Sequence, residues 1–328
     1  MAPVMGPAES VLAATVARRH LLLGEPKVEI AEKMGLSRFK VARLIEAARE
    51  GGLVTIQIAS PGRVDLDLSS QVKDALNLDH CAVVSGHDTQ DPDGRDARAK
   101  VTADLLSEIL EIGDVLGLPW SRSVLSMTEH LRSLPRVRVI QLSGAMEVEG
   151  ANASAVDIVR AAARVSEGET TIFHAPFILD NAQAAASIRR QPSVTAGLRA
   201  IQDVTHAVVG IGTWVSGSSS IFEWAGAQDR SEAQSAGVVG ETAGVFFNSA
   251  GETVHLPLTD RMITLSGDSL AAIPQVIAVA AGAGRSAALQ AATAGGLVNS
   301  AVIDTALAQT ILQKQTEVAN EPAVPGAP

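Results

Sequence analysis

Short apolar runs alternate with longer amphipathic stretches from residue 80 to residue 304, and this rhythm constrains the fold more than any other feature of the sequence. The stretches at 97–112, 154–166 and 181–189 have helical periodicity. Strands that alternate with helices in this way are typical of an α/β domain with a mainly parallel sheet and helices on both faces. Ligands of such sheets bind outside the carboxyl ends of the strands. The expected strands are CAVV, DVLGL, VRVIQL, TTIFHA, HAVVGIG and QVIAVAAG.

The composition fits that architecture and excludes other classes of protein. Aromatic residues make up 3% of the chain and Tyr is absent, so the core must be built from Ala, Val, Ile and Leu. These residues pack well between the layers of an α/β fold. No run approaches the roughly 20 apolar residues of a membrane span, and the first ten residues lack the pattern of a signal peptide. We therefore expect a cytoplasmic protein that does not contact membranes.

No metal site and no cofactor is expected. Cys81 is the only cysteine, which excludes an intrachain disulfide and a cysteine-based zinc site. The run HDTQDPDGRD at 87–96 resembles a calcium loop, but Lys100 falls where such a loop ends in Glu. A solvated acidic loop is therefore favoured. Gly210 and Gly212 lack the third glycine of a dinucleotide-binding loop.

A helix-turn-helix is predicted near the amino terminus from the spacing of Ala31, Gly35 and Val41. The small residue lets two helices approach, the glycine permits the positive φ of the turn, and the β-branched residue locks the pair. The run LVTIQI that follows is expected to form a strand, which would make this a winged helix-turn-helix. The expected helices cover residues 10–23, 28–34 and 38–50.

The polar side of the helix at 38–50 begins with basic residues. In this motif the amino-terminal residues of the recognition helix reach base edges in the major groove. Arg38 and Arg43 are therefore candidates for bidentate contacts to guanine, whereas Ser37, Lys27 and Lys40 are candidates for phosphate contacts. The complete set of candidate DNA-binding residues is Lys27, Ser37, Arg38, Phe39, Lys40, Ala42 and Arg43.

The alternative for this segment is a helical hairpin used for dimerisation, whose exposed basic residues would be only a solvated face. The charge distribution favours DNA binding, because residues 1–60 carry a balance of +2 and the remainder carries −12. A lone helix-turn-helix buries too little surface for tight specific binding. Two DNA-binding domains bound to the two half-sites of a palindromic operator bury enough surface. A homo-oligomer, either a dimer or a tetramer, is therefore expected.

The chain is predicted to have four segments. Residues 10–60 form the DNA-binding domain, and residues 61–78 form a linker helix around the amphipathic run Leu66–Leu76. Residues 79–316 form the effector-binding domain. A tail at 317–328 carries three prolines and no periodicity, so it is expected to be disordered.

Seven segments, taken in order, resemble the SorC family of sugar-responsive transcription regulators, and the resemblance covers roughly residues 18–314. In the DNA-binding domain the matching run is EIAEKMGLSRFKVARLIEAAREGGLVTI, in which Phe39 replaces a usual Pro and Ala42 replaces a common Ser. In the effector-binding domain the matching segments are GDVLGLPWSRSV (113–124), VIQLSGAM (139–146), HAPFILD (174–180), AVVGIGTW (207–214), GETAGVFFNSAGE (240–252) and AVAAGAGRSAALQAATAGGLVNSAVID (278–304).

The resemblance implies a body like glucosamine-6-phosphate deaminase and ribose-5-phosphate isomerase, with a Rossmann-like sheet. It also implies a regulator of a carbohydrate or polyol catabolic operon that binds operator DNA under the control of a phosphorylated sugar or polyol. The sequence departs from the family pattern at four positions of the body. Arg285 stands for a Lys, Ser121 for a Gly, Ser123 for a Thr and Glu241 for an Asp.

The effector is expected at the loop that follows the strand DVLGL. This loop carries hydroxyl groups and ends at an expected helix start, where free N–H groups and the helix dipole favour an anion. A phosphate would be held there by Ser121, Arg122 and Ser123, with Arg285 from the Gly-rich end of the last expected strand. The resemblance adds further positions. The complete candidate set is Gly117, Trp120, Ser121, Arg122, Ser123, Gly144, His174, Gly212, Glu241 and Arg285.

An isomerase or deaminase of the same fold is the main alternative. Schiff-base chemistry needs a lysine, yet after residue 60 the only lysines are Lys73, Lys100 and Lys314, and none lies on an expected ligand loop. His174 and Glu241 are conceivable acid–base groups, although a hydrogen bond to a sugar hydroxyl is favoured. No catalytic residue is therefore assigned. A DNA-binding scaffold without effector is disfavoured by the Gly, Ser and Thr residues at successive strand ends. Trp120 and Trp214 fit either the core or a pocket wall.

Overall fold

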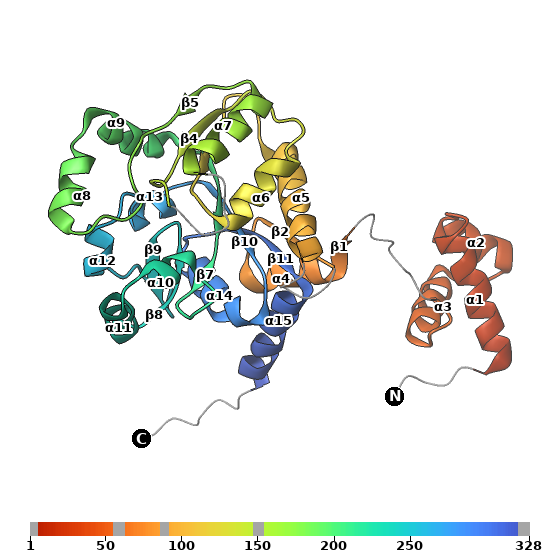
Figure 1. Cartoon of the computed structure of the whole chain (residues 1–328). Coiled ribbons are helices and arrows are strands. Elements are labelled where there is room, and N and C mark those ends of the chain that lie inside the picture. Colours follow the sequence, from red (N-terminus) through yellow and green to blue (C-terminus); the bar gives the residue numbers. More distant parts are fainter. Residues whose placement is uncertain (1–5, 55–62, 86–91, 147–153, 321–328) are drawn as a thin grey trace, which may run out of the picture. The chain divides into compact units, whose positions relative to one another are not determined.

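The computed structural model describes residues 6–54, 63–85, 92–146 and 154–320, and of 92, 93 and 315–320 only the backbone. The chain divides into two compact units, Met1–Ala59 and Ser60–Pro328 (Figure 1). Within the described residues, no helix is long and apolar enough to cross a membrane.

The smaller unit consists of three helices, α1 (Pro7–Leu21), α2 (Lys27–Met34) and α3 (Arg38–Glu50). Gly35 ends α2 with a φ of +64°, as the turn requires. Ser37 begins α3, where its hydroxyl oxygen accepts a hydrogen bond from the Lys40 N–H at 3.2 Å. The three helices bury a common core of small and branched residues. This core consists of Ala13, Val16, Ala17, Ile30, Ala31, Val41, Leu44, Ile45 and Ala48.

The expected strand of a wing falls largely on residues 55–58, which lie outside the described residues. The wing therefore stays a prediction. The two helices of the turn follow the sequence pattern closely, because a positive-φ glycine and a hydroxyl cap fix their boundaries locally.

The larger unit is built on a sheet of eight strands in the order β1-β2-β11-β10-β6-β3-β4-β5. All neighbouring strands are parallel except β1 and β2. The mainly parallel α/β sheet expected from the sequence is thus confirmed. The strands are β1 (Val64–Asp65), β2 (His80–Val84), β3 (Val115–Leu118), β4 (Arg138–Gln141), β5 (Thr170–Thr171), β6 (His206–Gly210), β10 (Gln275–Ala280) and β11 (Ser300–Asp304).

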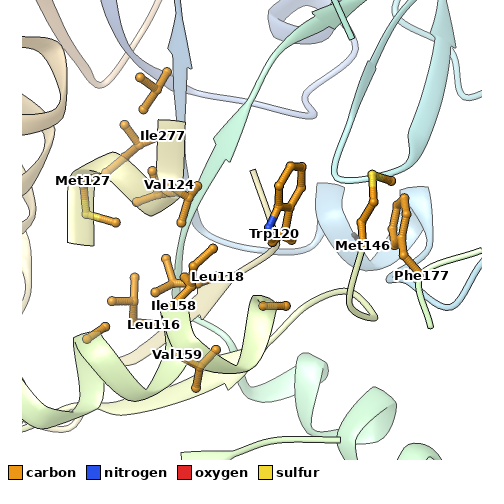
Figure 2. Close-up of a cluster of buried hydrophobic side chains, with 14 of the residues drawn as sticks. Leu116, Leu118, Trp120, Val124, Met127, Met146, Ile158, Val159, Phe177 and Ile277 are labelled. Carbon is orange, nitrogen blue, oxygen red and sulfur yellow. The ribbon is translucent and has the colours of Figure 1, made fainter. Parts of the chain in front are cut away.

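Alternate residues of these strands pack into two cores, one on each face of the sheet, as a period of two requires. Along β10, Ile277 and Val279 belong to one core, and Val276, Ala278 and Ala280 to the other. The first core lies under α5 (Pro92–Ile109), α6 (Arg122–His130) and α7 (Ala155–Ser166), and part of it is shown in Figure 2. The second lies under α4 (Leu66–Leu76), α14 (Ser286–Ala294) and α15 (Thr305–Asn320).

A second sheet of three antiparallel strands was not expected from the sequence. It has the order β7-β8-β9, with β7 (Gly212–Thr213), β8 (Val238–Thr242) and β9 (Val245–Asn248). β8 and β9 form a hairpin whose turn residues Ala243 and Gly244 both have positive φ. The strand β11 was also not expected. Short apolar runs of this kind cannot be told from helical segments by periodicity alone.

The remaining helical elements surround these two sheets (Figure 1). They are α8 (Ala182–Arg189), α9 (Pro192–Ala200), α10 (Ser220–Trp224), α11 (Ala227–Ser235), α12 (Pro257–Asp260), α13 (Gly267–Ala271) and the 3₁₀ turns η1 (Ile201–Asp203) and η2 (Ala283–Arg285).

The expected linker helix is α4, and it packs inside the larger unit. It contacts α15, α14 and β2, and its Val72 is fully buried in the second core. At the carboxyl end, α15 continues to Asn320, beyond the start of the expected tail at residue 317. The last eight residues lie outside the described part of the chain.

Candidate functional site

A cavity of about 670 Å³ opens at the carboxyl ends of the parallel strands. Successive connections lead from β3 towards one edge of the sheet and from β6 towards the other, so the strand order reverses between these two neighbours. A crevice forms at such a switch point because the two connecting segments diverge. The volume lies within the range of small-ligand sites.

The start of α6 forms one wall of this cavity. The Ser121 hydroxyl oxygen accepts a hydrogen bond from the Val124 N–H at 3.1 Å, which caps the helix. Ser121, Arg122 and Ser123 all line the cavity. Gly210, at the end of β6, approaches so closely that a Cβ there would lie 3.4 Å from the Ser121 hydroxyl oxygen. The predicted anion-binding loop is therefore at the cavity surface.

Arg285 lines the cavity from η2, and its guanidinium group holds three segments together. It donates hydrogen bonds to the carbonyl oxygens of Ile211 at 3.0 Å and Ser218 at 3.1 Å, and to that of Ala281. Burial lowers the pKa of Arg285, an effect that the nearby Asp304 carboxylate opposes. Much of the donor capacity of this arginine is thus directed at the protein. A role in shaping the cavity follows directly from these contacts.

Glu241 enters the cavity from β8 and is 7% exposed. Its Oε1 accepts a hydrogen bond from the Ser219 hydroxyl at 2.8 Å. Gly212 on the paired strand leaves room for this carboxyl group, because a Cβ at Gly212 would lie 2.3 Å from the same oxygen. Burial raises the pKa of Glu241, and the Ser219 hydrogen bond opposes the rise.

We expect Glu241→Gln to stabilise the protein progressively, relative to wild type, as pH rises above the ordinary glutamate value near 4.5. A raised pKa in the folded state means that folding favours the protonated acid. Its contribution to stability is therefore present below that value and is lost as pH rises through the folded-state pKa. Gln stays neutral throughout. Urea unfolding of both proteins at several pH values from 5 to 8 measures the difference.

Asp157→Asn is the matched control for that comparison. Hydrogen bonds from Ser154 lower the pKa of Asp157 below its ordinary value of 3.8, so this carboxylate is charged over the whole range. Its difference from wild type should stay constant between pH 5 and 8. A constant difference for Glu241→Gln as well would contradict a raised pKa at Glu241.

Three of the predicted effector residues do not line the cavity. A Cβ at Gly117 would lie 2.9 Å from the Leu142 and Val204 side chains, so this glycine serves strand packing. A Cβ at Gly144 would lie 2.4 Å from the Pro176 carbonyl oxygen, where two loops meet. His174 is exposed beyond β5. The other seven predicted residues line the cavity, namely Trp120, Ser121, Arg122, Ser123, Gly212, Glu241 and Arg285.

The two tryptophans differ in their surroundings. Trp120 belongs to the first core and also lines the cavity, with Met146 and Phe177 at the same end of the cluster (Figure 2). Trp214 packs edge-to-face on Phe222 and Phe246 and is absent from the cavity lining. Trp120 is thus both core and pocket wall, and Trp214 is core.

Sequence reasoning missed several residues of the cavity wall. Arg95 and Arg98 reach it from α5, Ser218–Ser220 from the segment that follows β7, and Gly282–Gly284 from the end of β10. The arginines had a weak signal, namely two basic residues spaced i, i+3 on a helix that follows a strand. Among the described residues, no group of three or more His, Cys, Asp or Glu could hold a metal ion.

The predicted DNA-binding residues gather at the start of α3. Ser37, Arg38, Phe39, Lys40 and Arg43 are exposed, whereas Lys27 and Ala42 are partly buried. Phe39 is 86% exposed, an unusual position for an aromatic side chain. Within the described part of the chain, none of the basic side chains in this set takes part in an ion pair. They are therefore available to a partner.

The family model "Putative sugar-binding domain" matches residues 62–313, which is most of the larger unit and of the chain. The chain belongs to this family. The transcriptional regulator LsrR of Enterobacter sp. (strain 638) is 29% identical over 311 residues, which covers 93% of each protein. The uncharacterized transcriptional regulator YjhU of Escherichia coli (strain K12) is 26% identical and covers 88% of this chain and 90% of its own.

Solved structures agree with this assignment at the level of the fold. The full-length sorbitol operon regulator SorC from Klebsiella pneumoniae superposes with a TM-score of 0.70 at 22% identity, over 93% of this chain and 99% of its own. The expected SorC-type resemblance is confirmed. The protein is a transcriptional regulator with a sugar-binding domain, and the isomerase or deaminase alternative is not favoured, because the relatives are regulators.

Proposed function

We propose that the regulator binds operator DNA through the start of α3 and that a phosphorylated sugar or polyol in the cavity controls this binding. The charge of the cavity carries the proposal. Among the described residues, four arginines line it, Arg95, Arg98, Arg122 and Arg285, against the single carboxyl group of Glu241. Such an excess of cationic groups in a partly enclosed site favours an anionic ligand.

The phosphate group would lie at the start of α6. Backbone N–H groups and the positive end of the helix dipole are directed there, and the Ser123 hydroxyl and Arg122 are adjacent. Glu241 and Ser219 would bind sugar hydroxyls at the opposite wall. The uncharged walls of the cavity, such as Trp120 and Phe177, would contact the carbon skeleton.

The proposed partners follow from this division of roles. The DNA-binding domain, residues 10–60, would act as one of two or four copies on a palindromic operator in the cytoplasm. The effector-binding domain, residues 79–316, would bind the small molecule. The operon would serve carbohydrate or polyol catabolism. A substrate or product of the pathway that the operon encodes would then be the effector.

Thermal unfolding in the presence of phosphorylated sugars and polyols, each paired with its unphosphorylated parent, tests the function. A ligand that binds only the folded state raises the melting temperature. At least one phosphorylated compound should do so, and it should change the affinity for an operator fragment in a fluorescence anisotropy assay. If the parent compounds raised the melting temperature as much, the effector would not be a phosphate ester.

A further inference from the structure

Arg98 stands apart from the other arginines of the cavity because, within the described residues, no hydrogen bond or ion pair engages its guanidinium group. The residue is 6% exposed, yet no described residue gives its guanidinium group a hydrogen bond or an ion pair. Arg285 donates to three carbonyl oxygens and Arg122 donates to Ser220, so neither resembles Arg98 in this respect.

A buried cation without a partner is costly, since desolvation opposes its charge. Burial lowers the pKa of Arg98, and the nearby Asp304 opposes that effect without forming an ion pair. The Asp304 carboxylate already accepts hydrogen bonds from the N–H groups of Gly282 and Leu307. It is therefore engaged by the backbone and does not neutralise Arg98 by direct contact.

The guanidinium group of Arg98 remains accessible from the cavity. Arg98 lines that cavity. Among the described residues, every fully enclosed side-chain nitrogen or oxygen has a hydrogen-bond partner. The nitrogens of Arg98, for which the described residues supply no partner, are therefore not fully enclosed. Arg95, one helical turn earlier on α5, lines the same wall.

This wall is carried by α5, whereas the start of α6 belongs to the next helix along the chain. Among the described residues, the charged groups that act on Arg98 are Asp304 at the end of β11, Arg285 beyond β10 and Arg95, and Arg122 is not among them. The strands β11 and β3 lie three places apart in the sheet, which is about 14 Å at about 4.8 Å per strand. A phosphate bound by the N–H groups at the start of α6 would lie beside the end of β3, whereas Asp304, which acts on Arg98, is at the end of β11.

We propose that Arg98, with Arg95, forms a second anion-binding position in the cavity, and that the effector therefore carries two anionic groups. One is the phosphate at the start of α6. The other is a second phosphate or a carboxylate at the far end of the sugar. The inference rests on the proposed function, because it assumes an effector in this cavity, and it adds the charge and the length of that effector.

Inorganic phosphate tests the two positions without knowledge of the sugar. Thermal unfolding is followed against phosphate concentration at constant ionic strength for wild type, Arg98→Gln, Arg122→Ala and the double variant. The slope of stability against the logarithm of ligand concentration counts the ions bound by the folded state. We expect about two ions for wild type, about one for each single variant and about none for the double variant, which also corrects for general salt effects.

Stability in chloride alone separates a ligand-binding role from a structural one. Arg98→Gln removes a buried charge that no described residue pairs, so its melting temperature without phosphate should equal or exceed that of wild type. A clear drop would show that Arg98 supports the fold and would overturn the proposal. An unchanged phosphate slope in Arg98→Gln would also overturn it.

The same slopes distinguish this inference from the proposed function. If Arg122→Ala lost phosphate binding and Arg98→Gln bound phosphate as wild type does, the effector would carry a single phosphate group. That result would reject only the second position. No phosphate dependence in wild type would reject both. Glucose 1,6-bisphosphate and 6-phosphogluconate, each compared with glucose 6-phosphate, then show whether the second group is a phosphate or a carboxylate. The preferred probe with two anionic groups should bind at least 10-fold more tightly than glucose 6-phosphate, and Arg98→Gln should abolish that preference.

Discussion

Arg285→Ala is expected to lower the free energy of unfolding of the larger unit by about 2–4 kcal/mol, because three carbonyl oxygens lose a charged donor at once. These carbonyls belong to the segments after β6, after β7 and at the end of β10, so the variant should also loosen the cavity wall. Effector affinity should fall through this loss of shape. Urea unfolding and calorimetry with the best ligand of the screen measure the two effects.

Arg122→Ala is the matched control for this experiment. Arg122 lines the same cavity but is exposed, and it donates one hydrogen bond to the Ser220 hydroxyl at 3.2 Å. Its removal should change stability by no more than about 0.5 kcal/mol, as is usual for surface substitutions, while it weakens the binding of an anionic effector. Unchanged stability in Arg285→Ala would instead indicate that its hydrogen bonds are replaced by water and that Arg285 acts chiefly on the ligand.

The second large effect is expected at the DNA-binding residues. Arg38→Ala and Arg43→Ala should each cost about 1–3 kcal/mol in specific operator binding, or roughly 5- to 150-fold, if each contacts a guanine edge. Both side chains are exposed and have no ion pair within the described residues, so the stability of the smaller unit should not change. Fluorescence anisotropy at fixed salt, with an operator enriched from random DNA by the wild-type protein, measures the loss.

Arg49→Ala serves as the control for these two variants. Arg49 is also an exposed arginine of α3 but lies in its last turn, far along the helix from the base-contacting end. We expect it to leave base preference unchanged. If all three variants lost affinity equally and on every DNA sequence, the arginines would contact phosphates only, and sequence would be read by other residues such as Phe39.

The sequence by itself determined the elements whose signals are local. Gly35 and Ser37 fixed the turn between α2 and α3 through a positive φ and a hydroxyl cap, which need no distant partner. The alternation of apolar runs and amphipathic stretches gave the parallel sheet, because strands buried on both faces must be apolar throughout. The position of the loop before α6 at the ligand crevice was also predicted from local signals, because the end of a strand followed by the start of a helix can be recognised in the sequence.

Only the tertiary structure decided how those local pieces share a site. The sheet order brings β3 beside β6 and places β11 three strands away, and no periodicity reports that order. Arg285 was expected to hold a phosphate, yet its position between Ile211 and Ser218 directs most of its donors at the backbone. Arg98 has the sequence pattern of an ordinary basic residue of a helix, and its burial, with no partner among the described residues, follows only from the packing of α5 over the sheet. Contacts between residues so distant in the chain depend on the complete packing, which is why the place of Arg95 and Arg98 in the cavity wall could not be predicted from the sequence.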